Sequence, residues 1–338
     1  MKTILVTGGC GFIFSHFIRY ILNKYQDYKI INLDLLTYAG QIENTKDFKD
    51  NERYRFRKGD ICNEALVDEI MKKVDYVVHG AAASHVDRSI MKPNEFLRTN
   101  VLGTQVLLNR ARQHNIERFV HIGSDEEYGS TQGNSFKETD PLCPSNPYSS
   151  SKAAASLLAI SYFKSYHLPV IITRSSNNFG PNQYPEKLIP LFITNLIENK
   201  KIPLYGDGLN VRDWLYVLDN CRAIDMILHK GKEGEIYNVG GGNEKTNLET
   251  TRFILEKIGR DESYIQYVKD RPGHDRRYSL DFSKIKEELG WQPEYDFGDA
   301  LSETIQWYKN NEWWWKKIKS GEYLEYYKKQ YQNKIRTH

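Results

Sequence analysis

The sequence predicts an α/β protein built on a doubly wound parallel sheet, with a smaller C-terminal domain interleaved with it. Three observations predict this class. Short apolar runs alternate with helical patterns in the first half of the chain, a glycine-rich turn follows the first run, and proline and glycine interrupt the pattern after about residue 178. The expected strands lie at 4–7, 30–33, 54–58, 76–79, 119–122 and 170–173, and a strand at 235–239 is expected to return to the sheet.

The first strand runs into a glycine-rich turn, residues 7–11, which precedes a helix. Such a turn lets backbone N–H groups approach a pyrophosphate at the helix N-terminus, where the helix dipole favours negative charge. The second strand ends in Asp34, at the spacing where a carboxylate meets the ribose 2′-hydroxyl of a dinucleotide. Because Asp34 would repel a 2′-phosphate, a Rossmann-like domain that binds NAD is expected. The alternative is that Asp34 only caps a turn.

Polar residues follow the fifth strand, at the end of the sheet where parallel α/β proteins bind ligands. They are Ser124, Asp125 and Glu126. Tyr148 and Lys152 open the next helix and share one face of it. The positive charge of Lys152 favours a tyrosinate, so Tyr148 can act as a base near neutral pH while Ser124 hydrogen-bonds the same substrate hydroxyl. A tyrosine–lysine pair also arises by chance in a chain with 23 tyrosines, and its place in the fold is what gives it weight.

Asp125 and Glu126 distinguish a dehydration from a simple oxidation. Oxidising a sugar alcohol requires only the tyrosine, the lysine and the hydroxyl group, whereas eliminating water also requires a base for a C–H proton and an acid for the departing oxygen. Two adjacent carboxylates can divide these roles if their environments separate their pKa values. The alternative is that Asp125 and Glu126 only cap a loop.

Composition and charge exclude several other classes. The formal net charge of the 338 residues is +3, which is too small to indicate nucleic-acid binding, and no apolar stretch is long enough to span a membrane. Four cysteines are widely scattered, which predicts neither a disulfide framework nor a metal site. They are Cys10, Cys62, Cys143 and Cys221. A cytoplasmic protein without nucleic-acid or membrane partners is expected.

Six longer segments carry more specific information. They are SHVDRS at 84–89, DEEYG at 125–129, RSSNNFGP at 174–181, PEKLIP at 185–190, YGDGLNVRDW at 205–214 and DRPGHDRRY at 270–278. Through these segments almost the entire chain resembles the nucleotide-sugar 4,6-dehydratases, a family of extended short-chain dehydrogenase/reductases. The last two segments are too long and too specific to arise by chance.

The resemblance implies an internal redox cycle on a nucleotide-activated glucose, expected to be dTDP-glucose. Tyr148 would remove the C4 hydroxyl proton as hydride passes to NAD. Glu126 would then take the C5 proton, Asp125 would protonate the leaving C6 hydroxyl, and the hydride would return to C6. The product would be a 4-keto-6-deoxy sugar nucleotide.

Two sets of residues are expected to hold the cofactor and the substrate, and no metal ion is expected. The cofactor set is Gly8, Gly11, Phe12, Ile13, Asp34, Asp60, Ile61, Ala81, Tyr148 and Lys152. The substrate set is Ser84, Ser124, Asn177, Lys187, Pro203, Tyr205, Arg212, Asn247, Arg271 and His274. In the second set the resemblance assigns Arg212, Arg271 and His274 to the diphosphate, and it places Lys187, Pro203 and Tyr205 around the base.

Phe14 departs from the family pattern, because it occupies the place of the third glycine of the cofactor turn. That glycine usually allows close packing of helix against strand. Gly80, at the end of a neighbouring strand, stands where the family usually carries a large apolar residue. We therefore expect the Phe14 ring to fill the volume left at Gly80.

Four smaller departures surround the expected ligands. Ala83 replaces a usual glutamate, Gly123 a usual serine, and Ser124 a usual threonine, and these changes are expected either to widen the sugar pocket or to let ordered water in. Leu35 replaces a usual lysine beside Asp34, which is expected to loosen NAD binding.

The resemblance also predicts how the chain is organised. Residues 1–180 with 211–240 should form the NAD-binding domain, and residues 181–210 with 241–330 the nucleotide-sugar-binding domain. The helical patterns at 96–114 and 148–166 are similar to the helix pair that makes a four-helix dimer interface in this superfamily, so a homodimer is expected.

Three other functions stay open at this point. The substrate can be UDP-glucose, because a single methyl group discriminates by only about 1–3 kcal/mol. The protein can be a related epimerase or decarboxylase, against which Asp125 and Glu126 argue. The departures at Phe14, Ala83 and Gly123 also allow a catalytically weak sensor of NAD(H) or of a sugar nucleotide.

Overall fold

The computed structural model describes residues 1–320 and 322–331. Its main feature is a parallel sheet of seven strands in the order β10-β6-β5-β4-β1-β2-β3. The strands are β1 (Lys2–Thr7), β2 (Tyr28–Asp34), β3 (Tyr54–Lys58), β4 (Tyr76–His79), β5 (Arg118–Ser124), β6 (Val170–Ser175) and β10 (Ile236–Val239). The predicted fold class and the predicted return of the last strand are confirmed. The order reverses between β1 and β4, so their carboxyl ends form the crevice where such sheets bind ligands.

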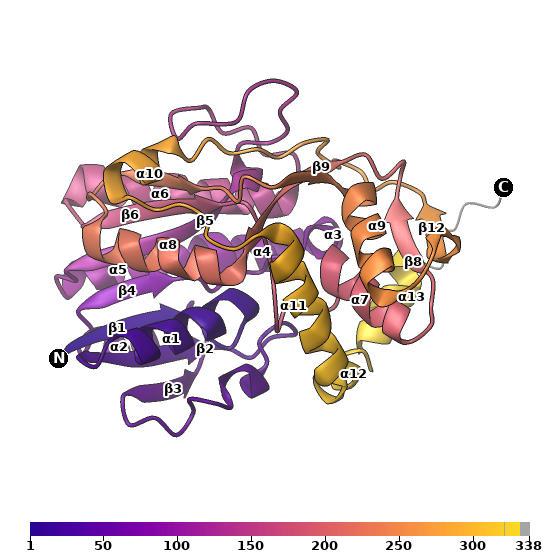
Figure 1. Ribbon diagram of the computed structural model, residues 1–338. Helices are drawn as coiled ribbons and strands as arrows, with labels where there is room; N and C mark the ends of the chain where they lie inside the picture. Colours follow the sequence, from indigo (N-terminus) through magenta and orange to yellow (C-terminus); the bar gives the residue numbers. More distant parts are fainter. Residues whose placement is uncertain (321, 332–338) are drawn as a thin grey trace.

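Helices cover both faces of this sheet (Figure 1). On one face α1 (Phe12–Lys24) packs against α8 (Val217–Lys230). On the other face lie α2 (Glu64–Met71), α5 (Gly103–Gln113) and α6 (Pro147–Tyr166). Each layer has its own apolar core, and the inner strands are buried from both sides, which explains why they appear in the sequence as continuous apolar runs.

The helix expected at 96–114 differs from the prediction. It starts earlier, as α4 (Pro93–Phe96), passes through a π-helical turn at Leu97–Leu102, and continues as α5. The side chain of Asn100 in this turn accepts a hydrogen bond from the Ala83 N–H (2.8 Å) and donates one to the Ala83 carbonyl (3.0 Å). The wider turn thus holds the segment after β4 in place, a long-range contact that helical periodicity does not reveal.

The C-terminal part gathers beyond the carboxyl ends of the strands (Figure 1). It contains a three-stranded sheet of β7 (Asn177–Phe179), β9 (Val211–Tyr216) and β11 (Glu244–Thr246), and a pair of β8 (Ile202–Tyr205) with β12 (Ile265–Val268). Its helices are α7 (Leu188–Ile197), α9 (Asn247–Ile258), α11 (Phe297–Asn310), α12 (Glu312–Ile318) and α13 (Glu322–Tyr331). The helix α10 (Ser283–Leu289) instead packs against β10 and α8, and the short α3 (Val86–Met91) follows β4. The three-stranded sheet joins strands from both predicted domains, and the division of the chain into domains stays a prediction. Within the described residues, no helix is long and apolar enough to cross a membrane.

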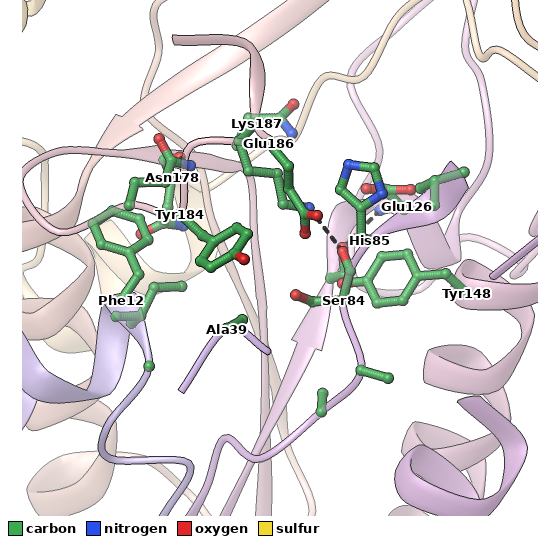
Figure 2. A pocket seen from close by; sticks show the side chains of 18 of the residues that line it. Phe12, Ala39, Ser84, His85, Glu126, Tyr148, Asn178, Tyr184, Glu186 and Lys187 are labelled. Atoms are coloured by element: carbon green, nitrogen blue, oxygen red, sulfur yellow. Dashed lines mark hydrogen bonds between the residues drawn. The ribbon is translucent and has the colours of Figure 1, made fainter. Parts of the chain in front are cut away.

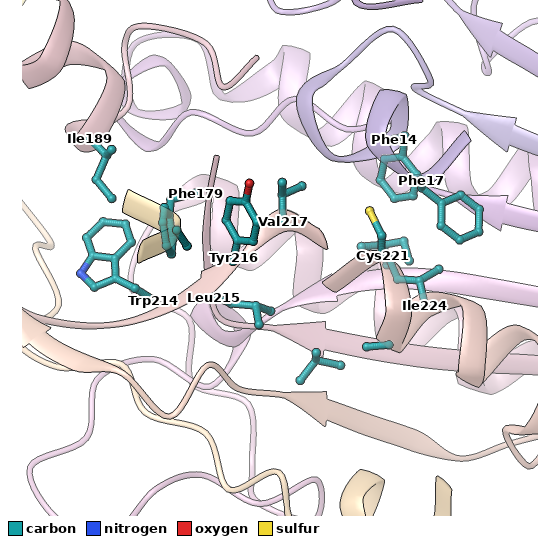
Figure 3. Close-up of a cluster of buried hydrophobic side chains, with 14 of the residues drawn as sticks. Phe14, Phe17, Phe179, Ile189, Trp214, Leu215, Tyr216, Val217, Cys221 and Ile224 are labelled. Atoms are coloured by element: carbon teal, nitrogen blue, oxygen red, sulfur yellow. The ribbon is translucent and has the colours of Figure 1, made fainter. Parts of the chain in front are cut away.

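Phe14 lies in the core between α1 and α8, beside Phe17 and Cys221 (Figure 3). A β-carbon built on Gly80 would lie only 1.9 Å from Cε2 of the Phe14 ring. The predicted exchange is therefore confirmed: the ring occupies the space that a side chain at position 80 would require.

Gly80→Ala is expected to lower the free energy of unfolding by about 1–3 kcal/mol, because the new methyl group overpacks against Phe14. Phe14→Ala should cost about 3–5 kcal/mol through the cavity that it opens. In the double variant, Gly80→Ala should cost much less than it does alone, since the ring is gone. Urea unfolding measures all three, with Gly133→Ala as the control, because nothing lies within 4 Å of a β-carbon at Gly133. Additive costs would contradict the packing argument.

Candidate active site

One cavity of about 620 Å³ lies at the carboxyl ends of the parallel strands. Its walls come from the glycine turn, from the segments after β2, β4 and β5, from the start of α6 and from the C-terminal part. Every residue predicted for catalysis, for the cofactor or for the substrate lines this cavity. The structure thus brings together positions from Gly8 to His274, and their individual roles stay predictions.

The glycine turn leaves room for a ligand at the start of α1. Gly8 has a φ of +78°, and a β-carbon there would come within 2.8 Å of the Ala81 Cα, so only glycine fits. Gly11 is the N-cap of α1 and makes no side-chain cap. The N–H groups of Phe12 and Ile13 lie in the first helical turn, where no intrahelical acceptor exists. This geometry fits a dinucleotide pyrophosphate.

Asp34 is fixed beside this turn by two backbone hydrogen bonds. Its carboxylate accepts from the N–H of Cys10 (2.9 Å) and from the N–H of Leu36 (2.8 Å). Burial raises the pKa of Asp34, and these two bonds act against that rise. Carboxylate oxygens have further lone pairs, so Asp34 can also accept from a ribose hydroxyl.

The end of β5 is anchored by a buried ion pair. Glu127 contacts Arg174 at 2.8 Å and accepts a hydrogen bond from the Ser124 N–H at 2.9 Å. A β-carbon on Gly123 would lie 2.7 Å from Glu127 Oε1 and 2.7 Å from the Thr173 carbonyl oxygen. The expectation that Gly123 widens the pocket is therefore wrong, because its missing side chain would point into space that the protein itself fills.

Tyr148 and Lys152 lie side by side on the first turns of α6, which Asn146 caps through the N–H of Ser149. Burial and the nearby Glu126 raise the pKa of Tyr148, and a hydrogen bond with Ser124 opposes them. The Lys152 ammonium group donates to the Ile122 carbonyl. Burial lowers the pKa of Lys152 to about 8. In the ligand-free protein Tyr148 therefore presents an unionised phenol to the cavity, and Lys152 presents an ammonium group that loses its proton more easily than an exposed lysine does.

Asp125 and Glu126 have different electrostatic environments. Burial, Glu126 and Asp213 raise the pKa of Asp125 well above its usual range. Burial also raises the pKa of Glu126, but three cations oppose that rise. They are Arg271, Lys187 and Arg212. The site thus keeps Asp125 protonated more strongly than Glu126, which is the separation that an acid and a base require.

The far end of the cavity is positively charged and holds unpaired polar atoms. Lys187 donates to the Ser84 carbonyl at 2.8 Å and lies near Glu126 (Figure 2). Arg212 is buried with its guanidinium 4.3 Å from the Tyr278 ring centre. Several buried polar atoms have no hydrogen-bond partner among the described residues. They are Asp125 Oδ2, Glu126 Oε2, Asn177 Oδ1, Asn247 Oδ1 and Arg271 Nε. Buried polar groups are rarely left so. A ligand phosphate would satisfy the Arg271 N–H, and ligand hydroxyl groups could donate to the four oxygen atoms.

His274, which was predicted to bind the diphosphate together with Arg212 and Arg271, differs from these arginines in its charge. Its Nδ1 lies 2.6 Å from Asp270 Oδ1. Burial and the nearby Arg271 lower the pKa of His274 to about 4. At neutral pH His274 therefore carries a single proton, which its contact with the Asp270 carboxylate places on Nδ1, and it brings no positive charge to a phosphate.

Sequence reasoning missed a cluster between the two ends of the cavity. Arg88 of α3 donates to Glu186 at 3.0 Å, and its guanidinium lies 3.9 Å from the Tyr38 ring centre. Glu186 is buried, and burial raises its pKa while Arg88 opposes the rise. Arg88 and Glu186 both stand in segments that supported the family resemblance, which was the available signal. Their pairing across the chain was not readable.

Lys152→Met is expected to stabilise the ligand-free protein near pH 7, because it removes a buried charge. The pKa of Lys152 is about 8 in the folded protein, against an ordinary value of 10.5. Between about pH 8 and pH 10.5 the unfolded chain binds more protons than the folded protein does. The free energy of unfolding of the native protein therefore rises with pH, and its difference from that of Lys152→Met becomes smaller. Urea unfolding of both proteins at about pH 7 and about pH 9.5 tests this. A gap that does not change with pH would contradict it.

Comparison with known proteins identifies the family. A family model described as GDP-mannose 4,6 dehydratase matches residues 5–304. A dTDP-glucose 4,6-dehydratase from Actinoplanes sp. is 47% identical over 317 residues, covering 92% of this chain and 99% of that protein. The chain belongs to the nucleotide-sugar 4,6-dehydratase family.

Solved structures agree with this assignment. A dTDP-glucose 4,6-dehydratase from Streptomyces venezuelae, solved with NAD bound, has a TM-score of 0.92 and 48% identity, covering 94% of this chain and 100% of that one. A UDP-glucose 4-epimerase from Thermotoga maritima has a TM-score of 0.85 and 29% identity, covering 91% and 99%. The 4,6-dehydratase fold is thus shared with an epimerase, and the side chains in the cavity decide the reaction.

Proposed function

We propose that the protein is an NAD-dependent hydro-lyase that converts dTDP-glucose into its 4-keto-6-deoxy derivative. The observation that carries the proposal is the placement of Asp125 and Glu126 beside Tyr148 in one cavity, with charges that separate their pKa values. A 4-epimerase acts only at C4, and a decarboxylase expels no hydroxyl group, so neither reaction needs both a base for the C5 proton and an acid for a leaving oxygen. The identity to dTDP-glucose 4,6-dehydratases over most of the chain supports the same reaction.

The cofactor end of the cavity fits NAD. The N–H groups of Phe12 and Ile13 would bind the pyrophosphate, Asp34 would bind the adenosine ribose, and Lys152 would bind the nicotinamide ribose. When bound, NAD supplies an acceptor for the hydride from C4 and a donor that returns it to C6.

Tyr148 would remove the proton of the C4 hydroxyl group, with Ser124 as a second hydrogen-bond partner. The phenol is buried and its pKa is raised in the ligand-free protein, so ionisation requires nearby positive charge. Lys152 provides such a charge on the same helix face. The two residues therefore work as a unit.

Glu126 would take the C5 proton, which the neighbouring C4 ketone acidifies. Burial raises the pKa of Glu126 and the three cations around it oppose that rise, so Glu126 ionises more easily than Asp125, as the base of the pair requires. Asp125, held protonated, would donate to the C6 hydroxyl group as it leaves. Proton removal and proton donation then occur on adjacent residues of the segment that follows β5.

The substrate's diphosphate would lie against the buried Arg212 and the half-buried Arg271, since a guanidinium group can bind two phosphate oxygens at once. The base would lie near Pro203 and Tyr205 at the end of β8. In this arrangement the reacting sugar would lie between the predicted NAD-binding domain and the predicted nucleotide-sugar-binding domain.

Mass spectrometry of dTDP-glucose incubated with the protein and NAD in D₂O tests the proposal, with UDP-glucose in parallel. Loss of water with one solvent deuteron retained is expected, because Glu126 exchanges the C5 proton. If only UDP-glucose were converted, the substrate would be UDP-glucose and not dTDP-glucose. If the protein carries NAD and the mass of neither substrate changes, the proposed dehydratase activity is wrong and a role as a sensor is favoured.

We further propose a cytoplasmic homodimer, because apolar side chains are exposed on adjacent helices. Leu97, Leu102 and Leu157 are 52%, 49% and 57% exposed, on the π-helical turn and on α6. Such residues are typical of a helix-pair interface. All four cysteines are free thiols, which fits a reducing compartment. A molecular mass equal to that of a monomer, measured by light scattering, would contradict the proposed homodimer.

A further inference from the structure

We propose that the C-terminal helix α13 shapes the nucleotide end of the site, with Gln330 as a positioning residue that acts through Tyr205. The inference deepens the proposed function and rests on it, because Tyr205 is placed at the base of the nucleotide. Gln330 lies 125 residues away from Tyr205 in the sequence, and only the fold brings the two together.

The contact between α13 and the pocket is direct. The side-chain amide of Gln330 donates a hydrogen bond to the Tyr205 hydroxyl at 2.6 Å, and Gln330 is buried, with 6% of its surface exposed. The next residue, Tyr331, lines the cavity, and its ring centre lies 5.8 Å from that of Tyr205. The last turn of α13 thus forms one wall around the Tyr205 ring.

Tyr205 passes this constraint on to the phosphate-binding residues. Its hydroxyl donates to Asp87 at 3.2 Å, and Asp87 lies 3.8 Å from the Arg271 guanidinium. The Gln330 Nε2 group donates to the tyrosine oxygen, and the tyrosine proton is directed to Asp87. Gln330 therefore helps to orient the Tyr205 hydroxyl group toward Asp87, the residue that faces Arg271.

The helix is held firmly enough to serve this purpose. Tyr323 donates to the Pro185 carbonyl at 2.9 Å, and the Tyr327 hydroxyl accepts a hydrogen bond from Asn195 of α7 at 3.1 Å. Pro185 lies two residues before Lys187, another residue of the substrate set. Figure 1 shows α13 beside α7 and β8, so the helix is docked on the elements that carry the nucleotide end of the cavity.

Gln330 contacts none of the groups that move protons, so its effect should be on binding. We expect Gln330→Met, which keeps the volume and removes the donor, to raise the dissociation constant of thymidine diphosphate and the KM for dTDP-glucose by about three- to tenfold. The kcat should stay within about twofold, because the reacting atoms lie elsewhere. Calorimetry and steady-state kinetics measure these values.

Three further variants complete the experiment. Glu325→Gln, at an exposed position of the same helix, should change neither binding nor kinetics. Tyr205→Phe should weaken binding to a similar extent, and adding Gln330→Met to it should have little further effect, because the acceptor is already gone. An unchanged dissociation constant in Gln330→Met, or additive effects in the double variant, would overturn the inference. So would a fall in kcat that follows a fall in melting temperature, since that is the mark of a structural role.

Failure of the proposed function gives a different result. If the native protein binds thymidine diphosphate but converts no nucleotide sugar, the proposed dehydratase activity is wrong. The binding measurements would still test the role of Gln330. Native protein that turns over dTDP-glucose, with Gln330→Met equal to it in KM, would remove the inference alone.

Discussion

Tyr148→Phe is expected to lower the kcat for dTDP-glucose dehydration by about 100- to 10,000-fold, because it removes the group that is proposed to take the C4 hydroxyl proton. Tyr148 lies next to Phe96 in a small apolar cluster, with the ring centres 6.3 Å apart. Phenylalanine keeps this packing, so the fold and the cofactor site should survive. Steady-state kinetics measures the loss, and the NAD content of the purified variant should match that of the native protein.

The neighbouring Ser124→Ala variant is the matched comparison. Ser124 assists by hydrogen bonding and does not accept the proton, so its loss should cost clearly less than the loss of the Tyr148 hydroxyl group. A Tyr148→Phe protein that keeps most of its activity would transfer the role of the base to another group, of which Glu126 is a candidate in the same cavity.

Glu126→Gln and Asp125→Asn should each lower dehydration by about 100- to 10,000-fold, but they should stop the reaction at different steps. Without Glu126 the C4 oxidation can still occur and the C5 proton stays in place. The absorbance of NADH should therefore appear and persist, and substrate recovered from D₂O should carry no deuterium. Stopped-flow absorbance and mass spectrometry together identify this state.

Without the acid of Asp125, the C5 proton can still exchange through Glu126 while the C6 hydroxyl cannot leave. Substrate recovered from D₂O should then carry deuterium, with almost no loss of water. Asparagine is a close match for an aspartic acid whose pKa is raised well above its usual range, so the fold should be little affected. If the exchange results of the two variants were reversed, the roles of acid and base would be reversed as well.

The sequence by itself determined the sheet, the cofactor turn and the catalytic set. β3 and β4 have the predicted bounds, because a strand buried on both faces leaves a continuous apolar run that ends where the chain turns. Asp125 and Glu126 are neighbours in the chain, and Tyr148 and Lys152 are one helical turn apart. Patterns of this kind depend on the spacing of residues that are close in the chain, and this spacing can be read directly from the sequence.

The Phe14 and Gly80 pair was also predictable, because two departures of opposite size pointed to one shared volume. Gly123 shows the limit of that reasoning. A small residue predicts empty space only if the direction of the missing side chain is known, and here Glu127 lies in that direction. Direction is a property of the folded backbone, so the prediction of a wider pocket was wrong at this position.

Only the tertiary structure decided which distant residues complete the cavity. Arg88 and Glu186 are 98 residues apart, and Gln330 and Tyr205 are 125 apart, with no periodic pattern between them. The π-helical turn at Leu97–Leu102 likewise depends on the docking of Asn100 against Ala83. Such contacts form because the sheet and the C-terminal helices bring separate segments to one edge, and burial then makes each polar group bind the partner that it meets there.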